Sequence, residues 1–391
     1  MGVLGKLQID RTSIVDLLKE LVATNSVNPD VGKGPGESAV SNLIFEHLAS
    51  VDGLDVKKQR VADGRSNVVA ILRGAGGGRS LMLNGHMDTV GVGGMTIDPF
   101  EPFVENGMLH GRGACDMKGG LAAMIGAAKA LGASKPGLHG DVIFTFVVDE
   151  EHLSIGIEKL VEEYKADAAI VGEPTDMRIA TAHKGFVWVE IEFKGKAAHG
   201  SVPEKGLDAI AHAASFVLCL DELQASLRAH AHPLLGPAKI HTSTIVGGTH
   251  WSIIPDHCLL RLERRTIPGE TGASVVKEVQ QVLDRIREQN PYLNATAKCV
   301  FERPALETAE GQPVVQELQR ALHEVTGAST QVVGVPYWTD GALLARSGSI
   351  PTCIFGPGDI AVAHSPDEYV RVEDVLRAGE VYENVMRRFC H

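Results

Sequence analysis

Short runs of apolar residues alternate with amphipathic segments through most of the chain. Residues 12–23 and about 37–49 have the helical spacing of apolar positions, and a helix of small residues is expected over 119–131. The runs that are apolar on every face and end in Gly or a polar cluster are 67–72, 80–83, 142–148, 168–171 and 352–355. Such runs, alternating with helices, predict an α/β fold with a mostly parallel sheet flanked by helices.

The pattern changes near residue 184, where KGFVWVEIEFKG alternates apolar and polar positions as a half-exposed strand does. The elements expected after it are a helix at about 206–225, strands near 240–246 and 257–265, a helix near 272–289 and a strand near 296–301. This β-α-β-β-α-β order predicts an inserted α+β domain of the ferredoxin-like type. After the insert, the alternation of helices and buried strands typical of a parallel sheet resumes, with helices expected at about 313–326 and 373–389.

We therefore expect two domains, of which the larger is discontinuous. The larger domain is expected to comprise residues 1–182 and 301–391, and the insert residues 183–300. A length of 391 residues fits this division, since domains average roughly 150 residues. The glycines of RGAGGGR (73–79) lie between two apolar runs with no helix after them, which predicts a hairpin turn and not a dinucleotide-binding loop.

The charge balance limits the classes of partner. The chain has 37 Lys and Arg against 49 Asp and Glu, a formal net charge of −12, so it offers no broad basic field for nucleic acid or an anionic membrane. Its six cysteines are scattered with no C-x-x-C pair, which favours a reducing, cytoplasmic location. The N-terminal residues show no cleavable apolar core, and no window approaches the roughly 18 apolar residues of a membrane span.

Polar residues gather at the ends of the predicted buried strands. In open α/β sheets, ligands bind at the carboxyl ends of the strands, where the loops converge. The segments at these ends are NGHMDTV (84–90), GRGACDMKGG (111–120), VVDEEH (147–152), VGEPT (171–175) and GPGDIAVAHSPDEYV (356–370). Together they offer His86, Asp88, Asp116, Glu150, Glu151, Glu173 and His364 to one crevice. Two imidazoles with several carboxylates form a ligand set suited to zinc, with cobalt or manganese as substitutes.

These motifs, in this order, resemble those of the dinuclear zinc amidohydrolases that include acetylornithine deacetylase, succinyl-diaminopimelate desuccinylase, aminoacylase and carboxypeptidase G. The resemblance spans nearly the whole chain and implies a zinc-peptidase-like catalytic domain with an inserted lid. It implies that Asp116 bridges two zinc ions, with His86 and Glu173 on one ion and Glu151 and His364 on the other. Zinc can lower the pKa of a bound water to about 7, which provides a nucleophile near neutral pH.

Two further carboxylates have roles in this scheme. Asp88, two residues after His86, is expected to hydrogen-bond the other imidazole nitrogen and fix its tautomer. Glu150 and Glu151 are successive residues at a strand end, so their side chains leave in different directions, and one can bind metal while the other faces the substrate. Glu150 is therefore expected to take a proton from the attacking water and deliver it to the leaving nitrogen.

The insert carries two more candidate site residues by resemblance. KAAHGSVPEKGLDAI resembles the family segment whose histidine stabilises the tetrahedral oxyanion, a role that falls to His199. In dimeric relatives this histidine enters the partner's site, so a homodimer through the lid is implied. The family's arginine for the substrate carboxylate is best matched by Arg265 in ERRTIPGE, and Gly356 could add a backbone donor. Ser252 departs from the pattern, because many relatives have Asn there.

Several of these residues also have ordinary structural explanations. Arg265 could form a surface salt bridge, and His199 could be a lid-surface histidine in a monomer. Asp340, in YWTDGALL, is better explained as a helix N-cap than as a substrate contact. Other hydrolase and nucleotide chemistries are disfavoured, since the chain has no G-x-S-x-G, G-K-[ST] or H-E-x-x-H motif.

The resemblance therefore implies a dinuclear metal hydrolase that cleaves the amide bond of a small N-acyl amino acid, as acetylornithine deacetylase and succinyl-diaminopimelate desuccinylase do. The alternative within enzymes is a metallo-carboxypeptidase or dipeptidase with the same site, and Arg265 would accept a terminal carboxylate in either case. A hypothesis from another class is a non-catalytic protein that binds metal or small ligands. Glu150 weighs against it, because binding alone needs no such base.

Overall fold

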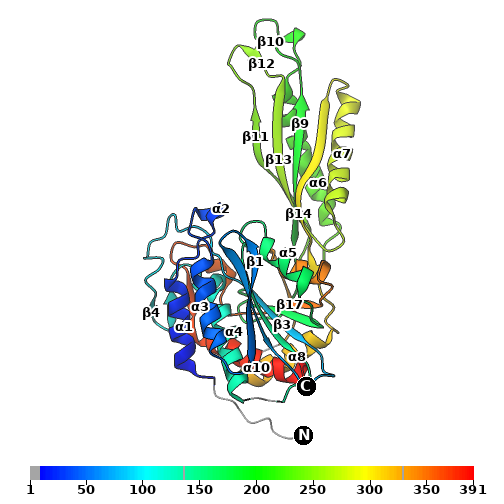
Figure 1. The fold of residues 1–391 in the computed structure, drawn as a ribbon. Helices are drawn as coiled ribbons and strands as arrows, with labels where there is room; N and C mark the ends of the chain where they lie inside the picture. Colours follow the sequence, from blue (N-terminus) through cyan, green and yellow to red (C-terminus); the bar gives the residue numbers. More distant parts are fainter. Residues whose placement is uncertain (1–8, 135–136, 328–329) are drawn as a thin grey trace. The chain divides into compact units, whose positions relative to one another are not determined.

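The protein is described by a computed structural model that covers residues 9–134, 137–327 and 330–391 (Figure 1). The chain forms two compact units. The first contains the residues up to Thr181 together with Thr308–Val333 and Thr339–His391. The second contains Ala182–Glu307 and a short later segment, Gly334–Trp338, which the sequence had placed in the larger domain.

The larger sheet has nine strands, and its parallel centre belongs to the first unit. The parallel neighbours are, in order, β6 (Val142–Val147), β3 (Leu81–His86), β7 (Ala168–Val171) and β17 (Thr352–Ile354). On one side, the antiparallel strands β2 (Arg65–Leu72) and β1 (Leu54–Ala62) extend the sheet beyond β6. On the other side, the antiparallel strands β8 (Ala180–His183) and β15 (Leu306–Glu307) extend it beyond β17. β16 (Val333–Val335) also pairs with β8. The predicted α/β class is confirmed, with antiparallel strands on both sides of the parallel centre.

Helices pack on this sheet and on one another. The helices of the first unit are α1 (Arg11–Ala23), α2 (Pro29–Gly32), α3 (Ser38–Ala49), α4 (Gly119–Ser134), α5 (Ile155–Glu163), α8 (Pro313–Thr326), α9 (Gly341–Arg346) and α10 (Val372–Phe389). α4 packs against both α1 and α10, and its small residues permit the close approach, since Gly126 faces the buried side chain of Ile14. None of the described helices combines the length and apolar character needed to cross a lipid bilayer.

Residues 73–79 do not form the predicted hairpin turn, because β2 and β3 are not neighbours and β6 lies between them. The segment instead runs along the turn before β6, where the backbone amide of Ala75 donates to the carbonyl of Leu138 at 2.8 Å. A Cβ on Gly78 would lie 2.4 Å from the backbone nitrogen of Gly140, so this close approach of two backbones requires glycine.

A small three-stranded sheet joins two segments that are far apart in the sequence. β18 (Tyr369–Arg371) pairs with β5 (Met108–His110), which pairs with β4 (Phe103–Glu105). The residues that follow β5 form a tight turn, η1 (Ala114–Lys118), ahead of α4. This pairing brings the residue before β18 to the turn that carries Asp116.

The second unit is a four-stranded antiparallel sheet in the order β11 (Lys239–Gly247), β13 (His257–Thr266), β9 (Gly185–Lys194) and β14 (Asn294–Arg303). Its helices are α6 (Ala209–Arg228) and α7 (Gly272–Gln289), which gives the predicted β-α-β-β-α-β order. Alternate residues of β9, from Val187 to Phe193, are buried in the core that the sheet shares with these helices. A two-stranded ladder, β10 (Ala198–His199) with β12 (Ile253–Ile254), completes the unit.

Candidate metal centre

The loops that follow the parallel strands carry the predicted ligands. His86 ends β3, Glu150 and Glu151 follow β6, Glu173 follows β7, Asp116 lies in η1, and His364 comes after β17 and the short helix η3 (Ile360–Val362). Parallel strands present their carboxyl ends at one edge of a sheet, so these loops converge there. The structure brings together all seven residues that the sequence assigned to the crevice, including Asp88.

The carboxylate of Asp116 lies between two imidazoles. Its Oδ1 atom is 2.9 Å from Nε2 of His86, and its Oδ2 atom is 3.2 Å from Nε2 of His364. A second carboxylate accompanies each imidazole: Oε1 of Glu173 is 3.7 Å from His86, and Oε1 of Glu151 is 3.2 Å from His364. The two oxygens of one buried carboxylate thus face two separate groups of donors.

The hydrogen bond of the other ring nitrogen sets the tautomer of His86. Its Nδ1 atom is 2.9 Å from the backbone carbonyl of Asp88, and a carbonyl can only accept, so Nδ1 carries the proton. The Nε2 atom of a neutral ring then directs its lone pair at Asp116. Two acceptors 2.9 Å apart require a proton or a cation between them.

Electrostatics favour a cation in this cluster. Burial and the charge of Glu173 raise the pKa of Glu150, while burial and the charge of Asp116 raise the pKa of Glu151 and of Glu173. Hydrogen bonds to Asp116 and Glu151 raise the pKa of His364 to about 10. The site therefore concentrates buried negative charge, which bound divalent cations would compensate.

Two overlapping groups of ligand atoms are close enough to hold metal. His86, Asp116 and Glu151 form one group and His86, Glu150 and Glu173 the other, each with its ligand atoms within 4.8 Å of one another. Imidazole nitrogen with carboxylate oxygen is the donor set of zinc and related cations, so these residues fit a pair of divalent ions. The second group also shows that Glu150 lies at the ligands themselves and not only beside them.

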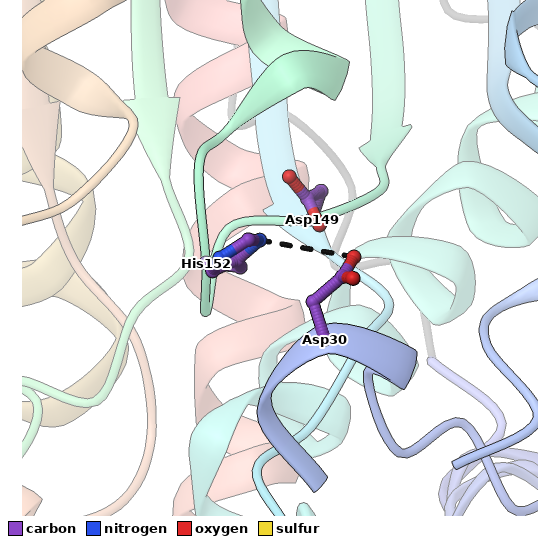
Figure 2. A group of neighbouring side chains, drawn as sticks. All are labelled: Asp30, Asp149 and His152. Carbon is purple, nitrogen blue, oxygen red and sulfur yellow. Dashed lines mark ion pairs between the residues drawn. The ribbon is translucent and has the colours of Figure 1, made fainter. Parts of the chain in front are cut away.

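A third group of acidic and imidazole side chains brings Asp149 and His152 of the loop after β6 close to Asp30 of α2 (Figure 2). Nδ1 of His152 is 3.7 Å from Oδ2 of Asp30, and the buried Asp149 lies beside them. The guanidinium of Arg65 already occupies this cluster, 2.8 Å from Oδ1 of Asp149 and 3.5 Å from Asp30. Because this charge neutralises the carboxylates, the group does not fit a second metal centre.

The carboxylate of Asp88 forms hydrogen bonds with other groups than the sequence predicted. Its carboxylate accepts hydrogen bonds from Nδ2 of Asn28 at 2.8 Å and from the backbone amides of Glu150 and Glu151 at 3.1 and 3.2 Å. The nearest carboxylate oxygen is 3.6 Å from Nδ1 of His86, whose hydrogen bond goes to the backbone carbonyl instead. The Asp88 side chain therefore anchors the loop that carries the two glutamates.

Glu368 is a site residue that sequence reasoning missed. Its carboxylate is fully buried and accepts from the backbone amides of Gly113, Cys115 and Asp116, each at 3.0 Å, and from the Arg112 guanidinium at 2.6 Å. It thus holds the turn that presents Asp116. The AHSPDEYV motif contains it, but its role depends on the pairing of β18 with β5 and has no local signature.

Two minor predictions have different outcomes. Asp340 occupies the N-cap position of α9, as predicted, but its buried side chain makes no capping hydrogen bond. The pKa of Glu150 is raised first by burial, then by the charge of Glu173 and also by the charge of Asp340. Asp340 therefore lies near the carboxylate cluster. The backbone amide of Gly356 donates to the hydroxyl of Thr175 at 3.1 Å, so it is not available to a substrate.

His199 and Arg265 belong to the second unit. Nδ1 of the exposed His199 accepts from the backbone amide of Ser201 at 3.2 Å and lies 2.7 Å from its hydroxyl, so a neutral ring carries its proton on Nε2. The Arg265 guanidinium donates to Glu263 at 2.5 Å and lies 5.5 Å from the ring centre of Phe186, with 38% of the side chain exposed.

Comparison with known proteins identifies the chain's relatives. A model of peptidase family M20/M25/M40 matches residues 82–388. The acetylornithine deacetylase of Myxococcus xanthus is 32% identical over 348 residues, covering 86% of this chain and 89% of the relative. The N-formyl-4-amino-5-aminomethyl-2-methylpyrimidine deformylase of Bacillus subtilis is 30% identical over 417 aligned residues, covering 98% and 96%.

Solved structures share the fold along almost the whole chain. A tripeptidase of Staphylococcus aureus superposes with a TM-score of 0.79 at 21% identity, covering 97% of this chain and 99% of that one. A Bacillus subtilis protein described as a dinuclear metal-binding peptidase of the M20 family superposes with a TM-score of 0.75 at 19% identity, covering 97% and 98%.

Proposed function

The chain belongs to peptidase family M20/M25/M40 and is therefore a hydrolase, and from this premise we propose that it cleaves the amide bond of small N-acyl amino acids. The observation that carries the proposal is the Asp116 carboxylate held between His86 and His364, with the half-buried Glu150 close to His86. The relatives named for deacetylation and deformylation support an acyl group removed from nitrogen.

Two divalent ions are proposed as the cofactor, zinc first and cobalt or manganese as substitutes. Asp116 would bridge them, with His86 and Glu173 completing one set of protein ligands and Glu151 and His364 the other. When bound, the pair would supply Lewis-acid chemistry, since it acidifies water and polarises the carbonyl under attack. The raised pKa values of the three glutamates support this assignment, because burial and mutual repulsion disfavour their charged forms and bound cations would stabilise those forms.

Glu150 is proposed as the proton carrier. The oxygen of water attacks the acyl carbon, and Glu150 takes the proton that this water loses. As the C–N bond breaks, Glu150 gives the proton to the leaving nitrogen, and the products are a carboxylate and a free amino group. Burial and the charge of Glu173 raise the pKa of Glu150 well above its usual value, and this favours the protonated form that a proton carrier must adopt during the reaction.

The second unit is proposed as the lid and the dimer interface. His199 would stabilise the oxyanion through Nε2, and Arg265 would bind the substrate carboxylate. A homodimer is supported by the outer strand β11, whose unpaired edge could join a second copy. Large apolar side chains are exposed on this unit at Leu218, Val246 and Trp251, which is fully exposed.

A metallo-carboxypeptidase or dipeptidase activity is the second candidate, since Arg265 would accept the terminal carboxylate of a peptide equally well. We also propose a cytoplasmic location, which is supported by the six cysteines because all of them are free thiols.

Turnover of a substrate panel tests the proposed activity. N-acetyl, N-succinyl and N-formyl amino acids and dipeptides would be supplied to the zinc- or cobalt-loaded chain, with the Glu150→Gln variant as the control. Hydrolysis of the N-acyl amino acids is expected, and it should be lost in the control. Hydrolysis of the dipeptides alone would favour the peptidase, and no hydrolysis of any member would overturn the proposal.

A further inference from the structure

A buried network of hydrogen bonds runs behind the loop that carries Glu150. We propose that Asn28 and Arg65 are positioning residues, which set the direction of the Glu150 carboxyl through two buried carboxylates, Asp88 and Asp149. This inference rests on the proposed role of Glu150 as the proton carrier. None of the roles proposed above includes Asn28, Arg65 or Asp149.

Asn28 joins the two carboxylates. Its Nδ2 atom donates to Oδ2 of Asp88 at 2.8 Å and to Oδ1 of Asp149 at 3.0 Å, so each hydrogen of the amide serves one carboxylate. Its own side-chain oxygen accepts from the backbone amide of Asp30 at 2.9 Å, which fixes the orientation of the amide group. Asn28 is fully buried and the two carboxylates are 1% exposed, so no water can easily replace this donor.

Arg65 holds the other end of the network. It pairs with Glu37 through two hydrogen bonds and also lies 2.8 Å from Oδ1 of Asp149. Glu37, fully buried, accepts from the backbone amide of Asp149 at 3.1 Å. The guanidinium therefore restrains both the side chain and the backbone of the residue that precedes Glu150.

The backbone explains why this restraint matters. Asp149 has a φ of 71°, in the left-handed region that residues other than glycine seldom adopt. The next two amides, those of Glu150 and Glu151, both donate to Asp88. An unfavourable backbone conformation persists only where its surroundings over-determine it, and Asn28 and Arg65 supply those surroundings. Without them the turn can relax, and the Glu150 carboxyl would move with it.

The effect on the reaction is expected in kcat. A displacement of about 1 Å at a reacting group can cost about 10²-fold in rate. Asn28→Ala and Arg65→Lys are therefore expected to lower kcat by about 10- to 100-fold with KM little changed, measured with the panel substrate that the wild-type chain hydrolyses fastest. The matched control is Gln224→Ala, which removes an amide that likewise bridges two groups, in the second unit.

A double-variant cycle separates positioning from a general loss of structure. In the Glu150→Gln background the residual kcat should not fall further on adding Asn28→Ala, because the network would act through Glu150. Metal content should stay at the wild-type value in all variants. A further fall of the same size in that background, or a loss of metal in Asn28→Ala, would overturn the inference.

Amide hydrogen exchange provides a readout that needs neither metal nor substrate. In the metal-free chain, exchange in the peptide that spans Asp149 to Leu153 should be faster in Asn28→Ala and Arg65→Lys and unchanged in Gln224→Ala. Unchanged exchange and unchanged kcat in both variants would overturn the inference. If Glu150→Gln itself keeps wild-type activity, the proposed role of Glu150 as the proton carrier fails instead, and faster exchange would still show that the network holds the turn.

Discussion

Nε2 of His364 lies 3.2 Å from Oδ2 of Asp116, on the oxygen that His86 does not face. One carboxylate can therefore serve two cations at once, each with its own imidazole. Although burial opposes its ionisation, the interactions with His364 and His86 hold the pKa of Asp116 well below its usual value. The carboxylate stays charged at any pH at which metal would bind.

Replacing this shared ligand should empty both positions. Asp116→Ala is expected to retain less than one ion per chain after dialysis against metal-free buffer, as measured by elemental analysis, because each ion loses a ligand. His364→Ala should retain one ion, since only one position includes that imidazole. His257→Ala, an exposed histidine of the second unit, is the control and should retain two. Two ions in Asp116→Ala would show that it is not the bridge.

Glu150→Gln should separate metal binding from turnover. The amide keeps the shape of the side chain but cannot carry a proton, so kcat is expected to fall by about 10²- to 10⁴-fold. Metal content should remain near two ions per chain, because the proposed ligands are intact. The exposed Glu162→Gln on the following helix is the control and should keep wild-type kcat. Wild-type turnover in Glu150→Gln would assign the base to another residue.

The parts of the site that lie on strand ends were predictable from the sequence, since a buried strand and the polar residues after it are contiguous. His86, Glu151 and Glu173 are of this kind. Asn28 and Glu368 were not predictable, because Asn28 bonds to residues 60 and 121 positions away and Glu368 to a turn about 250 positions away in the chain. Their polar side chains have no local pattern that distinguishes a buried anchor from a turn.

The hydrophobic pattern also could not predict whether the outer strands run parallel or antiparallel to their neighbours. The run at 67–72 is apolar on both faces, like a strand in a parallel sheet, yet β2 pairs antiparallel with both neighbours. Apolar content reports burial on two faces and carries no information on strand direction. The same limit produced the wrong hairpin at 73–79, since adjacent runs need not be adjacent strands.

Glu368→Gln should weaken metal binding without removing a ligand. The amide NH₂ would face backbone N–H donors that now meet a carboxylate oxygen, so the turn carrying Asp116 should shift. We expect metal affinity, measured by competition with a chelator, to fall by about 10- to 100-fold. Glu380→Gln, half-exposed on α10, should leave the affinity unchanged. An unchanged affinity in Glu368→Gln would mean that the turn is held by other contacts.

His199→Ala should reveal whether the lid acts within or between chains. Loss of the Nε2 donor is expected to lower kcat by about 10²-fold while KM changes little. If His199 enters the partner's site, co-expressing His199→Ala with Asp116→Ala should restore activity, because the mixed dimer then has one complete site. Random pairing gives about a quarter of the wild-type activity. Restoration that fails in verified mixed dimers would place His199 in its own chain's site.

Gly126 should be a determinant of the packing between α1 and α4. A Cβ at this position would lie 2.4 Å from Cδ1 and 2.5 Å from Cγ1 of Ile14, which is 1% exposed and cannot move into solvent. Alanine gains up to about 1 kcal/mol over glycine within a helix. Overpacking a core costs about 1–3 kcal/mol, so we expect Gly126→Ala to lower the free energy of unfolding measured in urea.

Two further variants test whether the loss of stability in Gly126→Ala arises from the contact with Ile14. Gly311→Ala adds a methyl group where no atom lies within 4 Å and should change the free energy of unfolding by less than about 0.5 kcal/mol. In an Ile14→Ala background the obstructing atoms are gone, so Gly126→Ala should become neutral or stabilising, because only the helix propensity remains. Equal destabilisation with and without the Ile14 side chain would mean that the cost arises elsewhere on α4.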